Sequence, residues 1–449
     1  MIRIAILPVI AGLLIGSSAA AQTLTDPGAA PPSAAIEPVT ADERIASLEE
    51  QVRELRTLLD DKKTKPSAVA VPKATKYPNI ELNGMLHIDG GVVAQDQANI
   101  DLYGDVDNSL GFRRARIGVD GFITEHLFFR LVPDFALSGR PSFRDAYVEY
   151  RDLPGIGTIR LGESRQPFGM DAQTPASELL FLERSLSFAL SPFRQTGLGF
   201  RNHNEDESVT WHGAVFGYTT DPYGNSINES GFGAAARSTA ILWEDESAET
   251  LVHVGADYAY LHPADEGLRY RSVPEYTGLQ RGLGASIAVM PSFVDTGFLD
   301  DATSNAFGLE LAAVRGPLLV QGELVASVVE LEAGDSATFR GAYAQAIYCL
   351  TGESHGYNRE FGHFKRLDPK CPVSEGGCGA WELAARFSLL DLEDGPIEGG
   401  TINDLTLGVN WFLNRHTRLQ FNYIHAWTDR APVGLNEADI YASRLAVDF

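Results

Sequence analysis

The chain has 449 residues, a net charge of −24 and a mean hydropathy of −0.09, which is too polar for a helical membrane protein. The acidic balance and the lack of a basic stripe exclude nucleic-acid binding. Three cysteines are too few for a disulfide scaffold, and no histidine pair stands beside them at zinc-ligand spacing. We therefore expect neither a metal nor another cofactor.

The first 21 residues are typical of a cleaved secretory signal. Arg3 precedes an apolar stretch over 4–15, and small residues follow up to Ala21. The apolar core has about 12 residues, whereas a membrane-spanning helix needs about 20. We expect residues 1–21 to be removed on export. Any later membrane crossing must then use a closed barrel, the other structure that satisfies its own backbone hydrogen bonds in lipid.

Three short segments precede the main domain. Residues 22–39 form a Pro/Ala-rich linker, and 40–63 carry apolar residues at the 3-4 spacing of a coiled coil: Ile45, Leu48, Val52, Leu55 and Leu59. About three heptads are short for an independent coil, so its partners must already be held together. Residues 64–79 form a basic linker that is either a solvated tether or a functional patch.

Residues 80–449 predict an all-β, transmembrane antiparallel barrel of about 16 strands behind the short N-terminal coiled coil. The last nine residues alternate outward apolar side chains, such as Tyr441 and Leu445, with inward Arg444 and Asp448, and end on Phe449. We count roughly seventeen strand-like segments. A chain whose two ends both face the periplasm needs an even number of strands. We therefore expect that one strand between Arg269 and Met290 has been counted as two. Short turns such as 414–416 are expected to be periplasmic, and longer segments such as 429–439 extracellular.

Arginine is concentrated around one long interior segment. Residues 113–201 contain 12 Arg and no Lys against 10 acids, whereas 202–449 contain 13 Arg and 2 Lys against 35 acids. The segment 166–196 is apolar in its middle, so we expect it to fold into the barrel and narrow the pore.

A guanidinium track through this region would attract oxyanions without holding them permanently. The candidates on or beside the interior segment, and on the inner faces of nearby strands, are Arg114, Arg116, Arg130, Arg160, Arg165, Arg184, Arg194 and Arg201. In the alternative, each arginine pairs with an acid and only satisfies a polar lumen. The candidate acids are Asp134, Asp145, Glu163 and Glu183.

Several motifs across 80–449 together resemble the phosphate-selective porin O and P family. They include Phe112-Arg-Arg-Ala-Arg-Ile117, Arg160-Leu-Gly-Glu-Ser-Arg-Gln-Pro-Phe-Gly169, Phe181-Leu-Glu-Arg184 and Gly379-Ala-Trp-Glu-Leu-Ala-Ala-Arg-Phe387. The resemblance implies a 16-stranded homotrimeric porin in outer-membrane lipid, with an inward constriction loop. It also implies an arginine-lined path for small anionic solutes such as phosphate or polyphosphate.

Three other functions are weighed against an anion channel. A general or weakly cation-leaning porin is the first, because the barrel has only Lys365 and Lys370 and is acidic after residue 201. A barrel enzyme of lipase or protease type is not expected, since no nucleophile elbow appears. An envelope tether would need a longer coil. Separately, Cys371 and Cys378 could close a small disulfide loop and leave Cys349 unpaired.

Overall fold

The structure is a computed structural model that describes Glu50 and the residues 77–136, 141–218, 231–263, 267–278, 290–331 and 334–449. The chain divides into two units, Met1–Ala74 and Thr75–Phe449. Apart from Glu50 and residues 77–79, the predicted signal (1–21), linkers (22–39 and 64–79) and coiled coil (40–63) lie outside the described residues. In the described ranges, no helix has the length and apolar character needed to cross a membrane.

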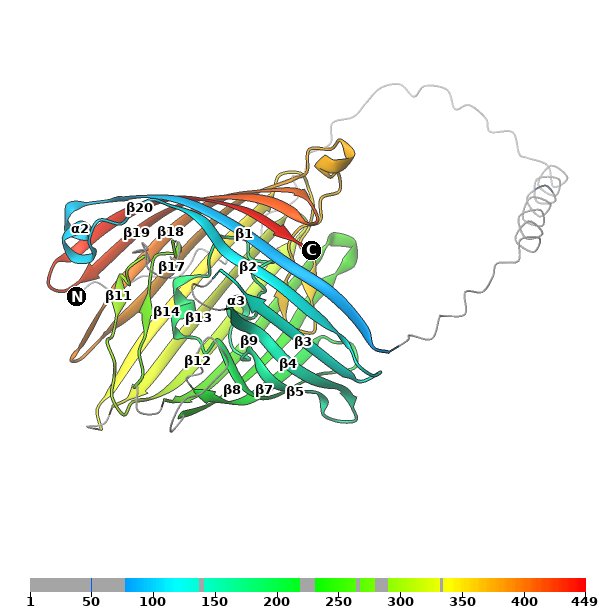
Figure 1. The fold of residues 1–449 in the computed structure, drawn as a ribbon, viewed down its shortest axis with the longest axis horizontal. Coiled ribbons are helices and arrows are strands. Elements are labelled where there is room, and N and C mark those ends of the chain that lie inside the picture. The colour runs from blue at the N-terminus through cyan, green and yellow to red at the C-terminus, as the bar shows by residue number, and fades with distance from the viewer. Residues whose placement is uncertain are drawn as a thin grey trace, which may run out of the picture. The chain divides into compact units, whose positions relative to one another are not determined.

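Sixteen antiparallel strands close into one barrel, which confirms the predicted fold class (Figure 1). β20 pairs with β1 to close the ring, so the N-terminal end of β1 and the C-terminal end of β20 lie at the same end of the barrel. The wall strands are β1 Asn79–Gln95, β2 Ser109–Phe122, β3 Leu127–Asp134, β4 Ser142–Leu153, β5 Gly157–Arg165, β6 Arg194–His203, β7 Val209–Tyr218, β8 Gly231–Asp245, β9 Thr250–His262, β12 Thr303–Arg315, β13 Leu318–Glu330, β14 Ser336–Cys349, β17 Ala380–Asp394, β18 Ile397–Asn414, β19 Thr417–Arg430 and β20 Gly434–Asp448.

Strict alternation builds the wall from outward apolar and inward polar side chains. In β20, Tyr441 is 56% exposed, whereas Arg444 and Asp448 are 1% and 5% exposed. Loops inside the lumen cover these inward side chains. The side chains are therefore buried, although the lumen they face is polar. The face assignments made from the sequence for β20 are confirmed.

On the arginine-rich side, one β-bulge in β2 and one in β4 interrupt the alternation and re-aim an arginine. Arg113 of β2 is the extra residue opposite β1, and Arg144 of β4 is the extra residue opposite β3. A bulge adds one residue to a strand and re-aims its side chain. As a result, Arg113 joins Arg114 on the lumen side, and Arg144 joins Asp145 there.

Two segments fold into the barrel from the extracellular end. The inward loop, residues 166–193, carries α3 Met170–Gln173 and the 3₁₀ helix η1 Leu186–Leu190, and buries its apolar side chains against the wall. The second inserted loop, residues 263–302, is described at 267–278 and 290–302. It contains a two-stranded sheet of β10 Arg271–Ser272 and β11 Val294–Asp295. This small sheet is separate from the sixteen wall strands and accounts for the extra strand-like segment counted in the sequence.

The expected contrast between short periplasmic turns and long extracellular loops is wrong at two connections. Residues 350–379, between β14 and β17, form a long loop at the periplasmic end, which we call the periplasmic loop. It carries β15 Tyr357–Asn358, β16 His363–Phe364 and η3 Val373–Glu375. Its Phe364 is buried with residues of the inward loop and the wall, so this loop enters the lumen. The segment 429–439 was expected to be a long extracellular loop, but it is mostly strand, because β19 ends at Arg430 and β20 begins at Gly434.

Candidate functional site

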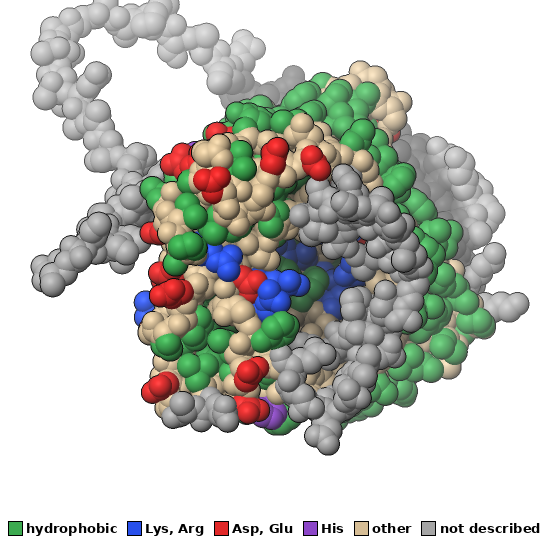
Figure 2. All heavy atoms as spheres, turned by 60° about the vertical axis from the view of Figure 1, so that its left-hand side comes forward, with side chains coloured by type: hydrophobic (Ala, Val, Ile, Leu, Met, Phe, Trp, Pro, Cys, Tyr) green, Lys and Arg blue, Asp and Glu red, His purple; other side chains and the backbone are tan. Residues whose placement is uncertain are grey.

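A cavity of about 400 Å³ lies between the inward loop, the second inserted loop and the barrel wall. We call its basic lining the upper arginine cluster: Arg113, Arg114, Arg116, Arg144, Arg184, Arg194 and Arg271. Its acidic lining residues are Glu183 and Glu275. Figure 2 shows basic side chains deep in the barrel mouth and acidic side chains around its rim. The cavity is therefore cationic in a chain whose net charge is −24.

The carboxylate of Glu183, on the inward loop, lies at the centre of this cluster. It receives Arg113 Nε at 2.8 Å, Arg114 Nη2 at 3.0 Å and, from β20, Arg444 Nη2 at 2.9 Å. Three guanidiniums surround this one carboxylate, so Glu183 alone leaves two positive charges unneutralised. Asp89 pairs with Arg444 and offsets one of these two charges. Such a fork of N–H donors is the arrangement that binds oxyanions.

Electrostatics keep this centre ionised. Burial alone would raise the pKa of Glu183, but Arg113, Arg114 and Arg444 hold that pKa well below its usual range. Burial lowers the pKa of the neighbouring Arg184 to about 10, which still leaves the guanidinium charged at neutral pH. Glu183 and Arg184 are therefore both charged at neutral pH.

Three arginines beside the cavities have no carboxylate within 4.0 Å among the described residues: Arg165, Arg184 and Arg271. Arg184 donates to the backbone carbonyl of Asp171 at 2.8 Å and lies over the ring of Phe193 at 4.9 Å. Arg271 is exposed, at the start of β10. No described carboxylate therefore neutralises these three guanidiniums at contact distance.

A second carboxylate, Glu149 of β4, repeats the arrangement nearer the periplasm. Arg151 Nη2 lies 2.8 Å from it, Arg160 Nη2 lies 2.7 Å from it, and Arg201 Nη2 donates to it at 3.1 Å. A cavity of about 290 Å³ adjoins Arg151 and Arg201 and also receives Arg359 from the periplasmic loop. We call these four arginines the lower arginine cluster.

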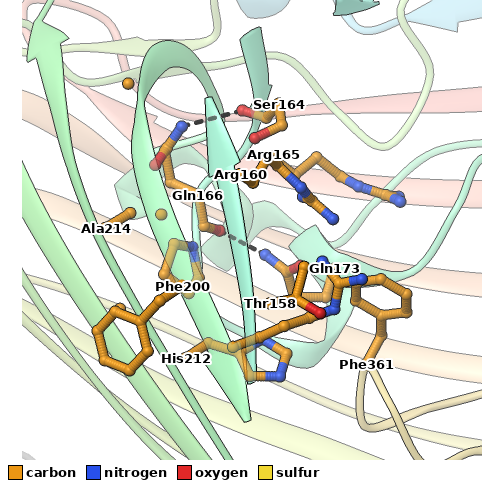
Figure 3. Close-up of a pocket in the computed structure, with 15 residues that line it drawn as sticks. Thr158, Arg160, Ser164, Arg165, Gln166, Gln173, Phe200, His212, Ala214 and Phe361 are labelled. Carbon is orange, nitrogen blue, oxygen red and sulfur yellow. Dashed lines mark hydrogen bonds between the residues drawn. The ribbon is translucent and has the colours of Figure 1, made fainter. Parts of the chain in front are cut away.

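A small pocket of about 40 Å³ adjoins the lower cluster (Figure 3). Arg160 and Arg165 of β5 line it together with Phe361 of the periplasmic loop. The ring of Phe361 lies 5.2 Å from the Arg201 guanidinium. Arginines therefore follow one another from the extracellular cavity towards the periplasmic end along a single side of the barrel.

Strands β9, β12 and β13 place acids in the lumen. Glu310 contacts Arg237 Nε at 2.6 Å and His253 Nε2 at 2.9 Å. Glu323 accepts hydrogen bonds from the Asp171 backbone N–H at 2.6 Å and from the Tyr343 hydroxyl. These carboxylates are held by partners, but they give the lumen an acidic side that faces its basic one.

Six of the eight arginines named from the sequence lie within 4.0 Å of a carboxylate: Arg114, Arg116, Arg130, Arg160, Arg194 and Arg201. Arg116 pairs with Asp134, and Arg194 pairs with Asp145 at 3.4 Å. Arg114, Arg116, Arg184 and Arg194 meet in the upper cavity. Arg160, Arg165 and Arg201 line the small pocket, while Arg130 lines neither and pairs with Asp120.

Sequence reasoning missed several arginines of these clusters: Arg113, Arg144, Arg151, Arg271, Arg359 and Arg444. Adjacent charges inside a strand, as at Arg113-Arg114 and Arg144-Asp145, were an available signal. A period-2 strand cannot put two consecutive side chains on its wet face unless it contains a bulge. Nothing local indicated Arg271 or Arg359, which long loops bring in.

The periplasmic loop is anchored by polar contacts in the lumen. Arg366 Nη1 lies 2.7 Å from Asp448 Oδ2 of β20, and its backbone N–H donates to Glu178 of the inward loop at 2.5 Å. His355 lies between the Lys365 carbonyl, at 2.7 Å, and the Glu382 carboxylate, at 2.8 Å. The loop thus contacts both the wall and the inward loop.

Comparisons with known proteins give a consistent result. The family model described as phosphate-selective porin O and P matches residues 80–449. Porin O of Pseudomonas aeruginosa is 25% identical over 396 residues, which cover 80% of this chain and 87% of that protein. An uncharacterized protein of Caulobacter vibrioides is 27% identical over 357 residues, 77% of this chain and 68% of that protein. A loop L8 deletion mutant of OmpT, an outer membrane protein of Vibrio cholerae, shares the fold at 13% identity, with a TM-score of 0.51 over 83% of this chain and 99% of that chain.

Proposed function

The chain belongs to the phosphate-selective porin O and P family of outer-membrane porins, and we propose that its water-filled channel passes small anions such as phosphate or polyphosphate. The observation that carries this proposal is the excess of guanidinium over carboxylate around Glu183 and Glu149. Each of these acids is bound by three arginines.

The local excess outweighs the overall acidity of the chain because charge acts over short distances. At physiological ionic strength, exposed charges are screened beyond about 8 Å. Acids on the extracellular rim therefore act weakly on an ion in the upper cavity, whereas its lining guanidiniums act at contact distance. An anion would exchange from one arginine fork to the next and would not be trapped at a single site.

The alternative is a general or weakly cation-leaning porin. It is favoured by Asp257, Glu310 and Glu323, which are buried on the opposite side of the lumen. Most of the arginines are also already paired with acids, so their attraction for a passing anion is reduced. A direct measurement of charge selectivity separates the two functions. A diffusion channel needs no catalytic group, and we propose no enzymatic activity.

We also propose that the porin is a homotrimer of exported chains. β3 has 8 residues and β5 has 9, so β3 falls below, and β5 lies at the lower limit of, the about 9–11 residues of a transmembrane strand. This short side of the wall is apolar outside, with Leu131, Leu161 and Leu198 exposed. Protein neighbours would cover it better than lipid. Export by a cleaved signal at residues 1–21 remains part of the proposal.

Neutralising unpaired arginines tests the proposed path without leaving a carboxylate alone. We would change Arg165→Gln and Arg271→Gln and measure the reversal potential of the purified porin in a planar bilayer under a KCl gradient. Removing one charge about 8 Å from the ion path changes the local energy by about 0.5 kcal/mol, so the anion-to-cation permeability ratio should fall about twofold for each change. Arg415→Gln, in an exposed turn, is the matched control. Unchanged reversal potentials in both variants would overturn the arginine path.

A further inference from the structure

The periplasmic loop ends in a short segment with an exposed cysteine at each end, Cys371 and Cys378. Both thiols are free in this structure. The remaining cysteine, Cys349, is buried at the end of β14, where its Sγ donates to Glu353 Oε2 at 3.2 Å. The two exposed thiols are therefore the pair that an oxidant in the periplasm would meet.

The backbone of this segment brings its two ends together. The Gly379 N–H donates to the Cys371 carbonyl at 2.9 Å, and the Gly377 N–H donates to the Pro372 carbonyl at 3.0 Å. Backbones linked by such bonds approach to about 5 Å. A disulfide spans Cα atoms about 4.4–6.8 Å apart. A Cβ placed on Gly377 would lie 2.8 Å from the Cβ of Cys371, so only glycine fits beside this cysteine.

We propose that Cys371 and Cys378 form an intramolecular disulfide in the mature porin. The thiolate of one cysteine attacks the disulfide of a periplasmic thiol oxidase, forms a mixed disulfide and releases one oxidase thiol. The second cysteine thiolate then attacks the mixed disulfide, forms the Cys371–Cys378 bond and releases the other oxidase thiol. Two protons and two electrons leave the porin, and the oxidase is reduced to its dithiol. This step needs only the oxidising compartment of an outer-membrane protein, not anion selectivity.

The disulfide would fix the end of the periplasmic loop to the rim of the barrel. The Cys378 carbonyl accepts hydrogen bonds from both Trp381 Nε1, at 3.2 Å, and Trp411 Nε1, at 2.9 Å. The two indoles stack with their centroids 4.9 Å apart. η3 and the C-terminus lie at this end of the barrel in Figure 1. The bond would therefore hold the Cys378 carbonyl on the tryptophan pair while the rest of the loop enters the lumen.

The test is a thiol count on protein made in its own membrane. Intact cells are treated with N-ethylmaleimide, and the porin is purified, unfolded in the reagent without reductant and weighed by mass spectrometry. We expect one maleimide, on Cys349, and three after reduction. Peptide mapping should find the 371–378 link. Three maleimides without reductant, or a disulfide-linked dimer on a non-reducing gel, would overturn the proposal.

Two variants guard against a misassigned pair. Cys349→Ser should carry no maleimide before reduction, because its remaining cysteines are joined. Cys378→Ser should carry two, on Cys349 and Cys371. If Cys349→Ser instead carries two, Cys349 is a partner in the native bond and the proposed pairing is wrong. Heat-modifiable migration on an SDS gel shows that each variant still forms a barrel.

Discussion

Arg114 Nη2 lies 3.0 Å from Glu183 Oε2 and joins the barrel wall to the loop that narrows the pore. The same carboxylate also receives Arg113 and Arg444, so one acid on the loop is held by two strands that are distant in sequence. A carboxylate in this position occupies the arginine fork that a passing oxyanion would use. Glu183 therefore holds the inward loop in position, and in the proposed anion path it would also compete with a passing oxyanion.

Glu183→Gln should strengthen anion binding. The change removes one negative charge at contact distance, where two unit charges interact by at least about 1 kcal/mol. We expect phosphate to block chloride current at a concentration at least about fivefold lower. The measurement is phosphate titration of single-channel conductance, with exposed Glu398→Gln as the matched control. A weaker phosphate block in Glu183→Gln would show that the carboxylate helps to build the site.

The effect of Glu183→Gln on the reversal potential under a KCl gradient should be the same at pH 4 and at pH 7, where the permeant ions do not titrate. A carboxyl group whose pKa is lowered by folding stabilises the folded state fully at pH values above its unfolded-state pKa. This stabilisation, and the charge of the folded carboxylate, are lost only as the pH falls through the folded-state pKa. Because the pKa of Glu183 is held well below its usual range, the carboxylate stays ionised at pH 4. If the variant and the wild type behave alike at pH 4 but differ at pH 7, Glu183 has titrated and its arginine partners are weaker than the structure indicates.

The periplasmic loop should loosen as the pH rises. Burial lowers the pKa of His355, but the Glu382 carboxylate raises it by more than burial lowers it, so the pKa lies above its ordinary value. The stabilisation from this raised pKa is fully present below the unfolded value of about 6.5 and is lost as the pH rises through the folded value. Hydrogen exchange of residues 350–379, corrected for intrinsic rates, should be faster at pH 9 than at pH 6.

His355→Gln supplies the comparison for this loop. Its corrected exchange should be fast at both pH values, since glutamine carries no positive charge to pair with the Glu382 carboxylate. An equal response to pH in the wild type and in His355→Gln would assign the loosening to another group.

Gly84 and Phe449 control closure of the barrel. Their backbones exchange hydrogen bonds at 2.8 and 3.0 Å, and the ring of Phe449 occupies the space that a Cβ on Gly84 would need. Gly84→Val should displace this ring at a cost of about 1–3 kcal/mol. We expect less heat-modifiable barrel in the membrane. Gly356→Val is the matched control, because its φ, like that of Gly84, lies outside the left-handed region and the nearest atom to its Cβ is Lys365 Cδ at 3.8 Å. Equal barrel yields for Gly84→Val and the wild type would contradict this packing.

The barrel was predictable from the sequence because alternation is a local signal. The faces of β20 follow from reading every second residue, and Arg114 and Arg116 are placed correctly in the same way. Arg113 and Arg144 were not, because each is the extra residue of a bulge, which period-2 reading excludes from the lumen face.

Non-local features set the remaining limits. Arg271 and Arg359 reach the pore on loops, and no spacing in the sequence shows which way a loop folds. The long periplasmic loop was likewise unexpected, since its position depends on counting every strand correctly. Whether an arginine is paired also depends on partners distant in sequence, as Arg444 and Glu183 show. The composition showed that arginine is enriched in this region, but it did not show that most of these arginines are paired with carboxylates.

The most direct test of the proposed anion path is the reversal potential of the wild-type porin in a planar bilayer under a KCl gradient, followed by addition of phosphate. We predict a reversal potential of the sign set by chloride, and a chloride current that falls as phosphate rises. A reversal potential of the sign set by potassium, with a current indifferent to phosphate, would contradict the anion path. In that case the arginine clusters would serve only to hold the inward loop.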